Sequence, residues 1–142
     1  VRPAVFRALD GVELILHAGD VGGDDILDEL STIAPVRAVY GNTDAPGNPR
    51  LAEAIDVQIG DVTVHVSHGH EVGSPNPKRL LEVYTADVIV YGHTHRQLVS
   101  HAEGRLVVNP GAAGARRFKL EPSVGLLRLD GDRVAVELVE LK

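Results

Sequence analysis

The sequence predicts an α/β domain, built on one mixed sheet or on two packed sheets with outer helices. In the first half, apolar runs typical of buried strands alternate with helical patterns, which favours parallel pairing. The second half consists mostly of strand pairs joined by short turns, which favours antiparallel pairing. The chain has 142 residues, enough for one hydrophobic core, so we expect a single domain over residues 1–142.

The first half is predicted to run from helix to strand, helix and strand. Pro3 suits a first helical turn, so the chain opens at a helix start. Residues 12–18 and 36–40 are predicted to form buried strands. Asp24 is expected to cap the helix between them, whose apolar stripe consists of Ile26, Leu27, Leu30 and Ile33. Residues 45–50 hold two prolines and a glycine and are expected to form a loop.

The second half is predicted to contain three hairpins and one helix. Residues 55–59 and 62–67 flank Gly60-Asp61, which is typical of a hairpin with a two-residue turn. A helix is expected over residues 78–84, after two prolines. The other predicted strands cover residues 87–91, 98–102, 105–108, 124–129 and 134–141.

The composition excludes several classes of protein. The chain has no Cys, which excludes a disulfide scaffold and a thiolate metal site. Its net charge is −6 and no stripe of Lys and Arg is present, which argues against duplex nucleic acid as a partner. Aromatic residues make up only 4% and Trp is absent, so we expect no base-stacking platform. No apolar run approaches the roughly 20 residues of a membrane-spanning helix.

Polar residues of one kind follow four of the predicted strands. They are Gly19-Asp20, Gly41-Asn42-Thr43-Asp44, Ser67-His68-Gly69-His70 and Gly92-His93-Thr94-His95, with Asn109-Pro110-Gly111 as a fifth polar strand end. Ligands of open α/β sheets bind beyond the carboxyl ends of the strands, so we expect these loops to meet on one rim. Each segment alone is most often a turn or a cap. Two His-x-His pairs, each directly after an apolar strand, together favour a metal site.

The residue types at these strand ends indicate which metals they suit. Asp, Asn and His offer oxygen and nitrogen donors, which suit Mn, Fe, Zn or Ni. Two such ions about 3.5–4 Å apart can clamp a phosphoryl group and activate water. The other three of the seven histidines are not assigned to this site. We expect His65 to pack in its strand or face solvent, His17 to be structural and His101 to be exposed.

The ordered set Gly-Asp, Gly-Asn-x-Asp, His-Gly-His and Gly-His-Thr-His resembles the calcineurin-like metallophosphoesterases. The closest resemblance is to their small bacterial and archaeal phosphodiesterase subfamily, which also contains the retromer subunit Vps29. It covers nearly the whole chain, including the Asn-Pro-Gly turn. It implies a four-layer α/β/β/α sandwich of two mixed sheets with outer helices. It also implies two divalent transition metal ions at the strand ends, Mn foremost, with Ni, Fe, Zn or Co as the other candidates.

The resemblance implies a role for each matching residue. Asp20 would bridge the two metal ions. Asn42, His68 and His93 would complete the second site, and His95 would bind the ion of the first site.

Three further roles follow from the same resemblance. His70 would line the substrate pocket as a catalytic residue. Asn42 would contact the substrate as well as a metal ion. Asp44 would support the ligands from outside the site.

The sequence departs from the family pattern at two places. The family opens with a strand that ends in Asp-x-His and serves the first metal, whereas Val1 stands where the following helix is expected. We therefore expect the native polypeptide to carry an extra N-terminal strand of about ten or more residues. Without it, the first metal keeps only Asp20 and His95. The second departure is Thr43, where larger family members carry a His thought to assist the leaving group. This favours a substrate with a good leaving group, or a different acid such as His70.

A basic loop follows Asn109-Pro110-Gly111 and contains Arg116 and Arg117. Flexible arginines beside a metal site can bind a phosphate bidentately, so both are candidate substrate-binding residues. A solvated loop is the alternative.

The predicted function is that of a metal-dependent phosphodiesterase, in which a metal-bound hydroxide attacks a small phosphodiester. The alternatives are a non-catalytic, Vps29-like scaffold for protein interactions and a phosphomonoesterase. We expect a cytoplasmic protein with no duplex nucleic acid and no membrane as partner, and homo-oligomerisation is left open.

Overall fold

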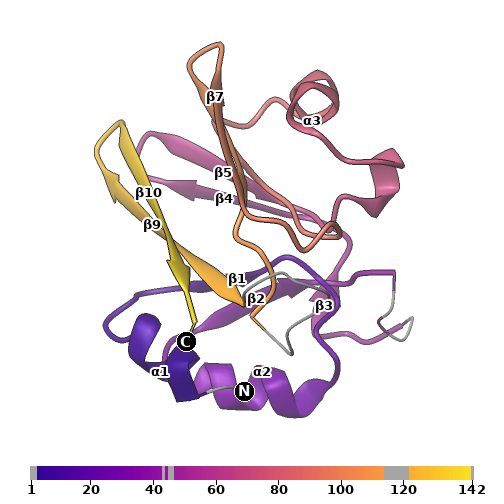
Figure 1. The fold of residues 1–142 in the computed structure, drawn as a ribbon, viewed down its shortest axis with the longest axis vertical. Coiled ribbons are helices and arrows are strands. Elements are labelled where there is room, and N and C mark those ends of the chain that lie inside the picture. The colour runs from indigo at the N-terminus through magenta and orange to yellow at the C-terminus, as the bar shows by residue number, and fades with distance from the viewer. Residues whose placement is uncertain (1–2, 43, 45–46, 114–121, 142) are drawn as a thin grey trace.

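The computed structural model describes residues 3–42, 44, 47–113 and 122–141. Its helices are α1 (Pro3–Ala8), α2 (Asp24–Ser31) and α3 (Pro77–Val83), with a short 3-10 helix, η1 (His70–Val72). Figure 1 shows α1 and α2 below a first sheet, a second sheet above it, and α3 on the far side of the second sheet. The predicted α/β class with two packed sheets and few helices is confirmed.

The first sheet is parallel and has the order β1-β2-β3. It consists of β1 (Ile15–His17), β2 (Val36–Val39) and β3 (Leu51–Ala52). The strand β1 is shorter than the predicted residues 12–18, and β3 follows the predicted loop over residues 45–50. Parallel strands end at the same edge, so the loops after β1 and β2 leave the sheet side by side.

The N-cap prediction for α2 is wrong by one residue. Gly23 is the N-cap, with an extended backbone (φ 162°, ψ 165°) and no side-chain cap bond, and Asp24 is the first helical residue. The Asp24 carboxylate accepts a hydrogen bond from the side chain of Asn48 at 2.8 Å. The Asp24 side chain therefore contacts a neighbouring loop. Its negative charge at the N-terminus of α2 still stabilises the helix.

The second sheet has the order β4-β5-β6-β8-β7. Its strands are β4 (Ile55–Ile59), β5 (Val62–Val66), β6 (Val88–Val90), β7 (Leu98–Ala102) and β8 (Arg105–Asn109). The outer pairs β4–β5 and β7–β8 are antiparallel hairpins, as predicted. The three central strands β5, β6 and β8 are parallel to one another. The segments after these three strands therefore leave one edge of the sheet together.

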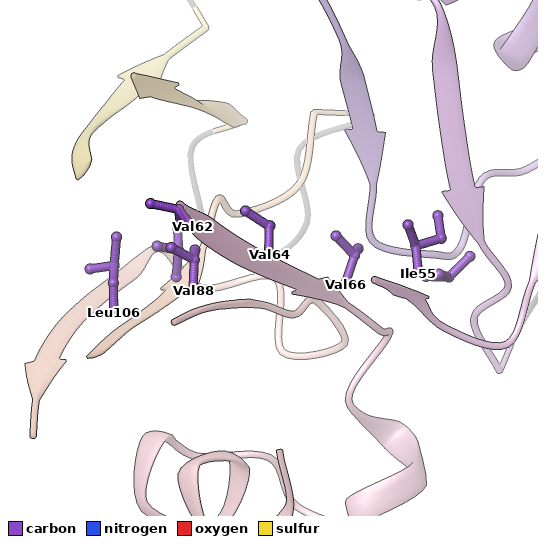
Figure 2. Packing of buried hydrophobic residues seen from close by; sticks show 8 residues of the cluster. Ile55, Val62, Val64, Val66, Val88 and Leu106 are labelled. Atoms are coloured by element: carbon purple, nitrogen blue, oxygen red, sulfur yellow. The ribbon is translucent and has the colours of Figure 1, made fainter. Parts of the chain in front are cut away.

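The main hydrophobic core lies between the two sheets. Val62, Val64 and Val66 alternate along β5 and point to the face of the second sheet that is turned away from α3 (Figure 2). Val88 and Leu106 lie on the same face and join this cluster. Val39 of the first sheet belongs to the same cluster. A second cluster joins α1 and α2 to the first sheet, and a third joins α3 to the second sheet.

The predicted C-terminal hairpin is confirmed as β9 (Ser123–Asp130) and β10 (Arg133–Glu140). Leu127 and Val136 of this hairpin pack against the core between the sheets. Val124 and Leu141, near its other end, pack against α1. The hairpin thus covers one side of both layers (Figure 1). None of the described helices is long and apolar enough to cross a membrane.

Candidate metal centre

Three predicted ligands from three strand ends lie in contact, with the imidazole of His68 between the other two. Asp20 follows β1, Asn42 follows β2, and His68 follows β5. The Nε2 atom of His68 lies 3.2 Å from Oδ2 of Asp20 and 3.2 Å from Oδ1 of Asn42. His68 is 2% exposed, so these contacts are shielded from water. The structure thus joins residues up to 48 positions apart at one point, as the strand order requires.

The other ring nitrogen of His68 fixes the tautomer. Nδ1 lies 2.8 Å from the carbonyl oxygen of Ala18, which can only accept a hydrogen bond. Nδ1 therefore carries the proton, and in the neutral ring Nε2 presents a lone pair. That lone pair faces two oxygen atoms, Oδ2 of Asp20 and Oδ1 of Asn42. Three electron-rich atoms around one point are stabilised by a cation between them.

Two more predicted site residues lie beside His68. Its ring centroid is 5.1 Å from that of His70 and 5.2 Å from that of His93. The rings of His70 and His93 are 6.3 Å apart. Nδ1 of His70 is buried and has no hydrogen-bond partner within the described part of the chain. His70 therefore has an uncommitted polar atom inside the cluster.

Two glycines make room for this cluster. A Cβ atom on Gly41 would collide with Oδ1 and the backbone nitrogen of Asp20. A Cβ atom on Gly19 would collide with the imidazole of His68. A side chain at either position would push the donors apart. Both positions therefore require glycine, because Asp20 and His68 approach the backbone so closely there.

The backbone is held in an uncommon conformation at three predicted ligands. Asp20, His93 and His95 have φ angles of 53°, 67° and 61°. This left-handed region is uncommon for residues with a side chain, and it clusters at functional sites. The structure thus holds these three residues in this conformation at an energetic cost, which we interpret as a sign of function.

Asp44 connects the loops that carry Asp20 and Asn42. Its Oδ2 accepts a hydrogen bond from the backbone N–H of Gly41 at 2.8 Å, and its Oδ1 accepts one from Gly22 at 3.2 Å. The carboxylate therefore links the loop after β1 to the loop after β2. Thr43, Arg116 and Arg117 lie outside the described residues.

Asn109 is a site-supporting residue to which the sequence analysis gave no role. It is fully buried at the end of β8. Its amide nitrogen donates to the carbonyl oxygen of Gly92 (3.1 Å) and to Oγ1 of Thr94 (3.0 Å), and its Oδ1 accepts from the N–H of Gly111 (2.9 Å). Thr94 separates His93 from His95, so Asn109 holds the segment that carries both. The sequence signal that could have indicated this role is the position of Asn109 in a polar segment directly after a predicted strand.

The three unassigned histidines are not among the donors around Nε2 of His68. His65 is buried in β5 and is packed in its strand, one of the two expected settings. His17 accepts a hydrogen bond at Nδ1 from the N–H of Gly19 at 3.2 Å. That contact supports the expected structural role, and His101 is exposed, as expected.

The donors suit one divalent cation by their chemistry. In the described residues, no three His, Cys, Asp or Glu side chains are arranged to hold a metal ion by themselves. The third donor around Nε2 of His68 is instead the amide oxygen of Asn42. A carboxylate, an amide oxygen and an imidazole nitrogen form a ligand set that Mn, Fe, Zn and Ni accept.

The structure gathers Asp, Asn and His at the strand ends of two packed sheets, and divalent cations held by such donors activate water in metal-dependent hydrolases. Residues 1–132 match the family model of the calcineurin-like phosphoesterase superfamily domain. The chain therefore belongs to the calcineurin-like phosphoesterase superfamily.

Individual proteins show the same relationship. The chain is 38% identical to a probable metallophosphoesterase of Methanothermobacter thermautotrophicus, over 98% of this chain and 82% of that protein. It is 27% identical to a phosphodiesterase of Methanocaldococcus jannaschii, over 83% of this chain and 77% of the relative. A zinc complex of Vps29 from Entamoeba histolytica has a TM-score of 0.80 and 26% identity, covering 100% of this chain and 91% of that one.

Proposed function

We propose that this protein is a metal-dependent phosphodiesterase that acts on a small phosphodiester. The observation that carries the proposal is the lone pair of His68 Nε2, directed at oxygen atoms of Asp20 and Asn42. A similar protein is named a phosphodiesterase, and a similar structure was solved with zinc. Mn is the metal that we propose, and the cytoplasm is the compartment.

The proposed ligands divide between two cations. Asn42, His68 and His93 would hold one ion, His95 the other, and Asp20 would serve both. Divalent cations bound there would supply Lewis-acid activation of water and neutralise charge on phosphate oxygens. The predicted upstream Asp-x-His segment stays a prediction.

The chain's own residues orient the substrate and move the proton. The Asn42 amide would hold a phosphate oxygen beside the cations. His70 would donate a proton to the leaving oxygen, because its ring lies beside those of the proposed ligands His68 and His93. Arg116 and Arg117 would bind the phosphate from the basic loop.

The experiment that tests this function combines metal analysis with hydrolysis. Protein reconstituted with Mn should bind metal and cleave bis(p-nitrophenyl) phosphate faster than p-nitrophenyl phosphate. His68→Ala should lose most of the metal at the site formed with Asn42 and His93 and should abolish cleavage. His101→Ala, which alters an exposed histidine, is the matched control and should change neither.

A Vps29-like scaffold is the second candidate function, favoured by the fold match to Vps29. Metal-loaded protein that cleaves neither ester above the His68→Ala background would support the scaffold. Preferential cleavage of the monoester would indicate a phosphomonoesterase instead.

A further inference from the structure

The face of the second sheet that is turned toward α3 carries a buried polar network. Val62, Val64 and Val66 point into the core between the sheets (Figure 2), so alternate residues of β5 and its extension lie on the opposite face. His65 and Ser67 occupy that face and are 4% and 1% exposed. Buried polar side chains need partners, and both have them.

The first part of the network joins an acid, an imidazole and a hydroxyl. Asp56 and His65 are paired across β4 and β5, and Oδ1 of Asp56 lies 2.8 Å from Nδ1 of His65. Nε2 of His65 lies 3.2 Å from Oγ of Ser67. Serine hydrolases use the same order of groups. Ser67 is too buried to meet a substrate, so this set acts only on its neighbours.

The second part of the network leads to the loop that follows β5. The rings of Tyr84 and His65 stack, with centroids 3.9 Å apart and planes 27° from parallel. The Tyr84 hydroxyl donates to Oε2 of Glu71 at 2.8 Å. Ser67 lies near the same carboxylate and lowers its pKa. Burial raises the pKa of Glu71, but Ser67 and the hydrogen bonds from Tyr84 and the backbone outweigh it and leave the pKa lowered, so Glu71 is a carboxylate at neutral pH.

Glu71 fixes the backbone at the residue before His70. Its Oε1 accepts a hydrogen bond from the N–H of Gly69 at 2.8 Å. Gly69 has a φ angle of 104°, which a residue with a side chain rarely adopts. His70 begins η1 directly afterwards, and its buried Nδ1 has no hydrogen-bond partner in the described chain. The placement of the His70 ring therefore depends on this backbone.

We propose that His65 and Tyr84 are positioning residues that, through Ser67 and Glu71, hold His70 beside the metal ligands. Neither residue touches the substrate or the metal in this scheme. The inference rests on the proposed function for its catalytic consequence only. The structural consequence, a fixed Gly69–His70 backbone, stands independently of any activity.

Four variants of the full chain test the proposal. Tyr84→Phe removes only the hydroxyl that donates to Glu71. His65→Asn keeps an amide near the place of Nδ1 but cannot reach Ser67, whereas His65→Gln places an amide near Nε2 and restores that partner. Thr63→Val is the matched control, because its hydroxyl pairs with Asp87 at the opposite end of β5, at 3.0 Å.

Two readouts are measured on each variant. The first is hydrogen exchange of the Gly69 amide in metal-free protein. It should be at least about fivefold faster in Tyr84→Phe and His65→Asn, because a hydrogen-bond partner of Glu71 or Ser67 is lost. The second is hydrolysis of bis(p-nitrophenyl) phosphate by the Mn-loaded protein. In the same two variants kcat should fall several-fold, while Mn affinity stays within about twofold of the wild type. His65→Gln and Thr63→Val should match the wild type in both readouts.

The proposal is overturned if Gly69 exchange in Tyr84→Phe equals that of the wild type. It is also overturned if His65→Gln loses as much protection as His65→Asn, since stacking alone would then explain the effect. An inactive wild-type protein with these exchange differences would contradict the proposed phosphodiesterase and leave the positioning network supported. An active wild-type protein whose variants show no exchange differences would support the proposed phosphodiesterase and contradict the positioning network.

Discussion

The Nε2 atom of His68 lies 3.2 Å from Oδ2 of Asp20, and neither atom has a proton to share when the ring is neutral. Nε2 has no proton because the carbonyl oxygen of Ala18, on the other side of the ring, holds the proton on Nδ1. A metal-binding histidine commonly donates its second N–H to such a carbonyl oxygen, which sets the tautomer and the ring direction. The donors around Nε2 of His68 thus present lone pairs to one point, which is the arrangement that the proposed cation requires.

Gly41→Ala should separate Asp20 from the other donors. The new Cβ atom would overlap Oδ1 and the backbone of Asp20, and the backbone has little freedom to move away. We expect Mn affinity to fall at least about tenfold, which corresponds to roughly 1.4 kcal/mol. Isothermal titration with MnCl₂ measures this change. Gly23→Ala is the control, because its backbone is extended and its nearest neighbour is the end of the flexible Asp25 side chain. Equal affinities in both variants would contradict the close-approach argument.

Asn109→Asp should loosen the segment that carries His93 and His95. The substitution replaces a donating amide nitrogen with an oxygen, which would face the oxygen atoms of Gly92 and Thr94. Leaving such buried groups unsatisfied costs about 1–3 kcal/mol, and urea unfolding should show a loss of that size together with weaker Mn binding.

The same chemical change at Asn76 serves as its control. Asn76 caps α3, accepting a hydrogen bond from the N–H of Arg79 at 2.9 Å, and Asp is an equally good cap. Asn76→Asp should therefore leave stability and metal affinity near the wild-type values. A stable Asn109→Asp with normal Mn affinity would refute the supporting role.

Local patterns explain what the sequence could predict. The Gly60-Asp61 hairpin follows from two alternating runs and the turn between them, and its register is confirmed. The helix predicted over residues 78–84 starts one residue earlier, at Pro77, because Asn76 is its cap. The four polar strand ends were visible because each follows an apolar run.

Features that depend on distant partners were not predictable from local pattern. The two-residue strand β3 exists only because Leu51 pairs with Ala38. The tautomer of His68 depends on Ala18, a residue 50 positions away. The role of Asn109 likewise depends on Gly92 and Thr94. Each requires the fold itself, which no short window of sequence contains.

Arg116→Ala and Arg117→Ala test the basic loop, which lies outside the described residues. A guanidinium that binds the phosphate of the substrate contributes mainly to substrate affinity. Each substitution should therefore raise KM for bis(p-nitrophenyl) phosphate several-fold with little change in kcat. Arg128→Ala is the control, since the side chain of Arg128 is 75% exposed and its contact with Glu137 is 3.9 Å long. Unchanged KM in both loop variants would remove the loop from the substrate site.

His17 should make the stability of the metal-free protein depend on pH. Burial lowers the pKa of its imidazole, against the attraction of Asp44 and Asp20, and the Gly19 N–H bonded to Nδ1 also favours the neutral ring. The unfolded chain, with a pKa near 6.5, then takes up a proton before the folded chain does. The stability that His17 contributes is complete above pH of about 6.5 and is lost as the pH falls toward the lower folded pKa.

His17→Asn tests this dependence, because its Oδ1 can still accept from the Gly19 N–H but cannot titrate. Urea unfolding in EDTA at pH 7 and pH 5 should show a smaller loss of stability for His17→Asn than for the wild type. The difference cannot exceed about 1.4 kcal/mol per pH unit, the limit for one titrating proton. His101→Asn removes an exposed histidine and should follow the wild-type curve. If His17→Asn loses as much stability as the wild type between these pH values, the neutral His17 is not the source of the acid sensitivity.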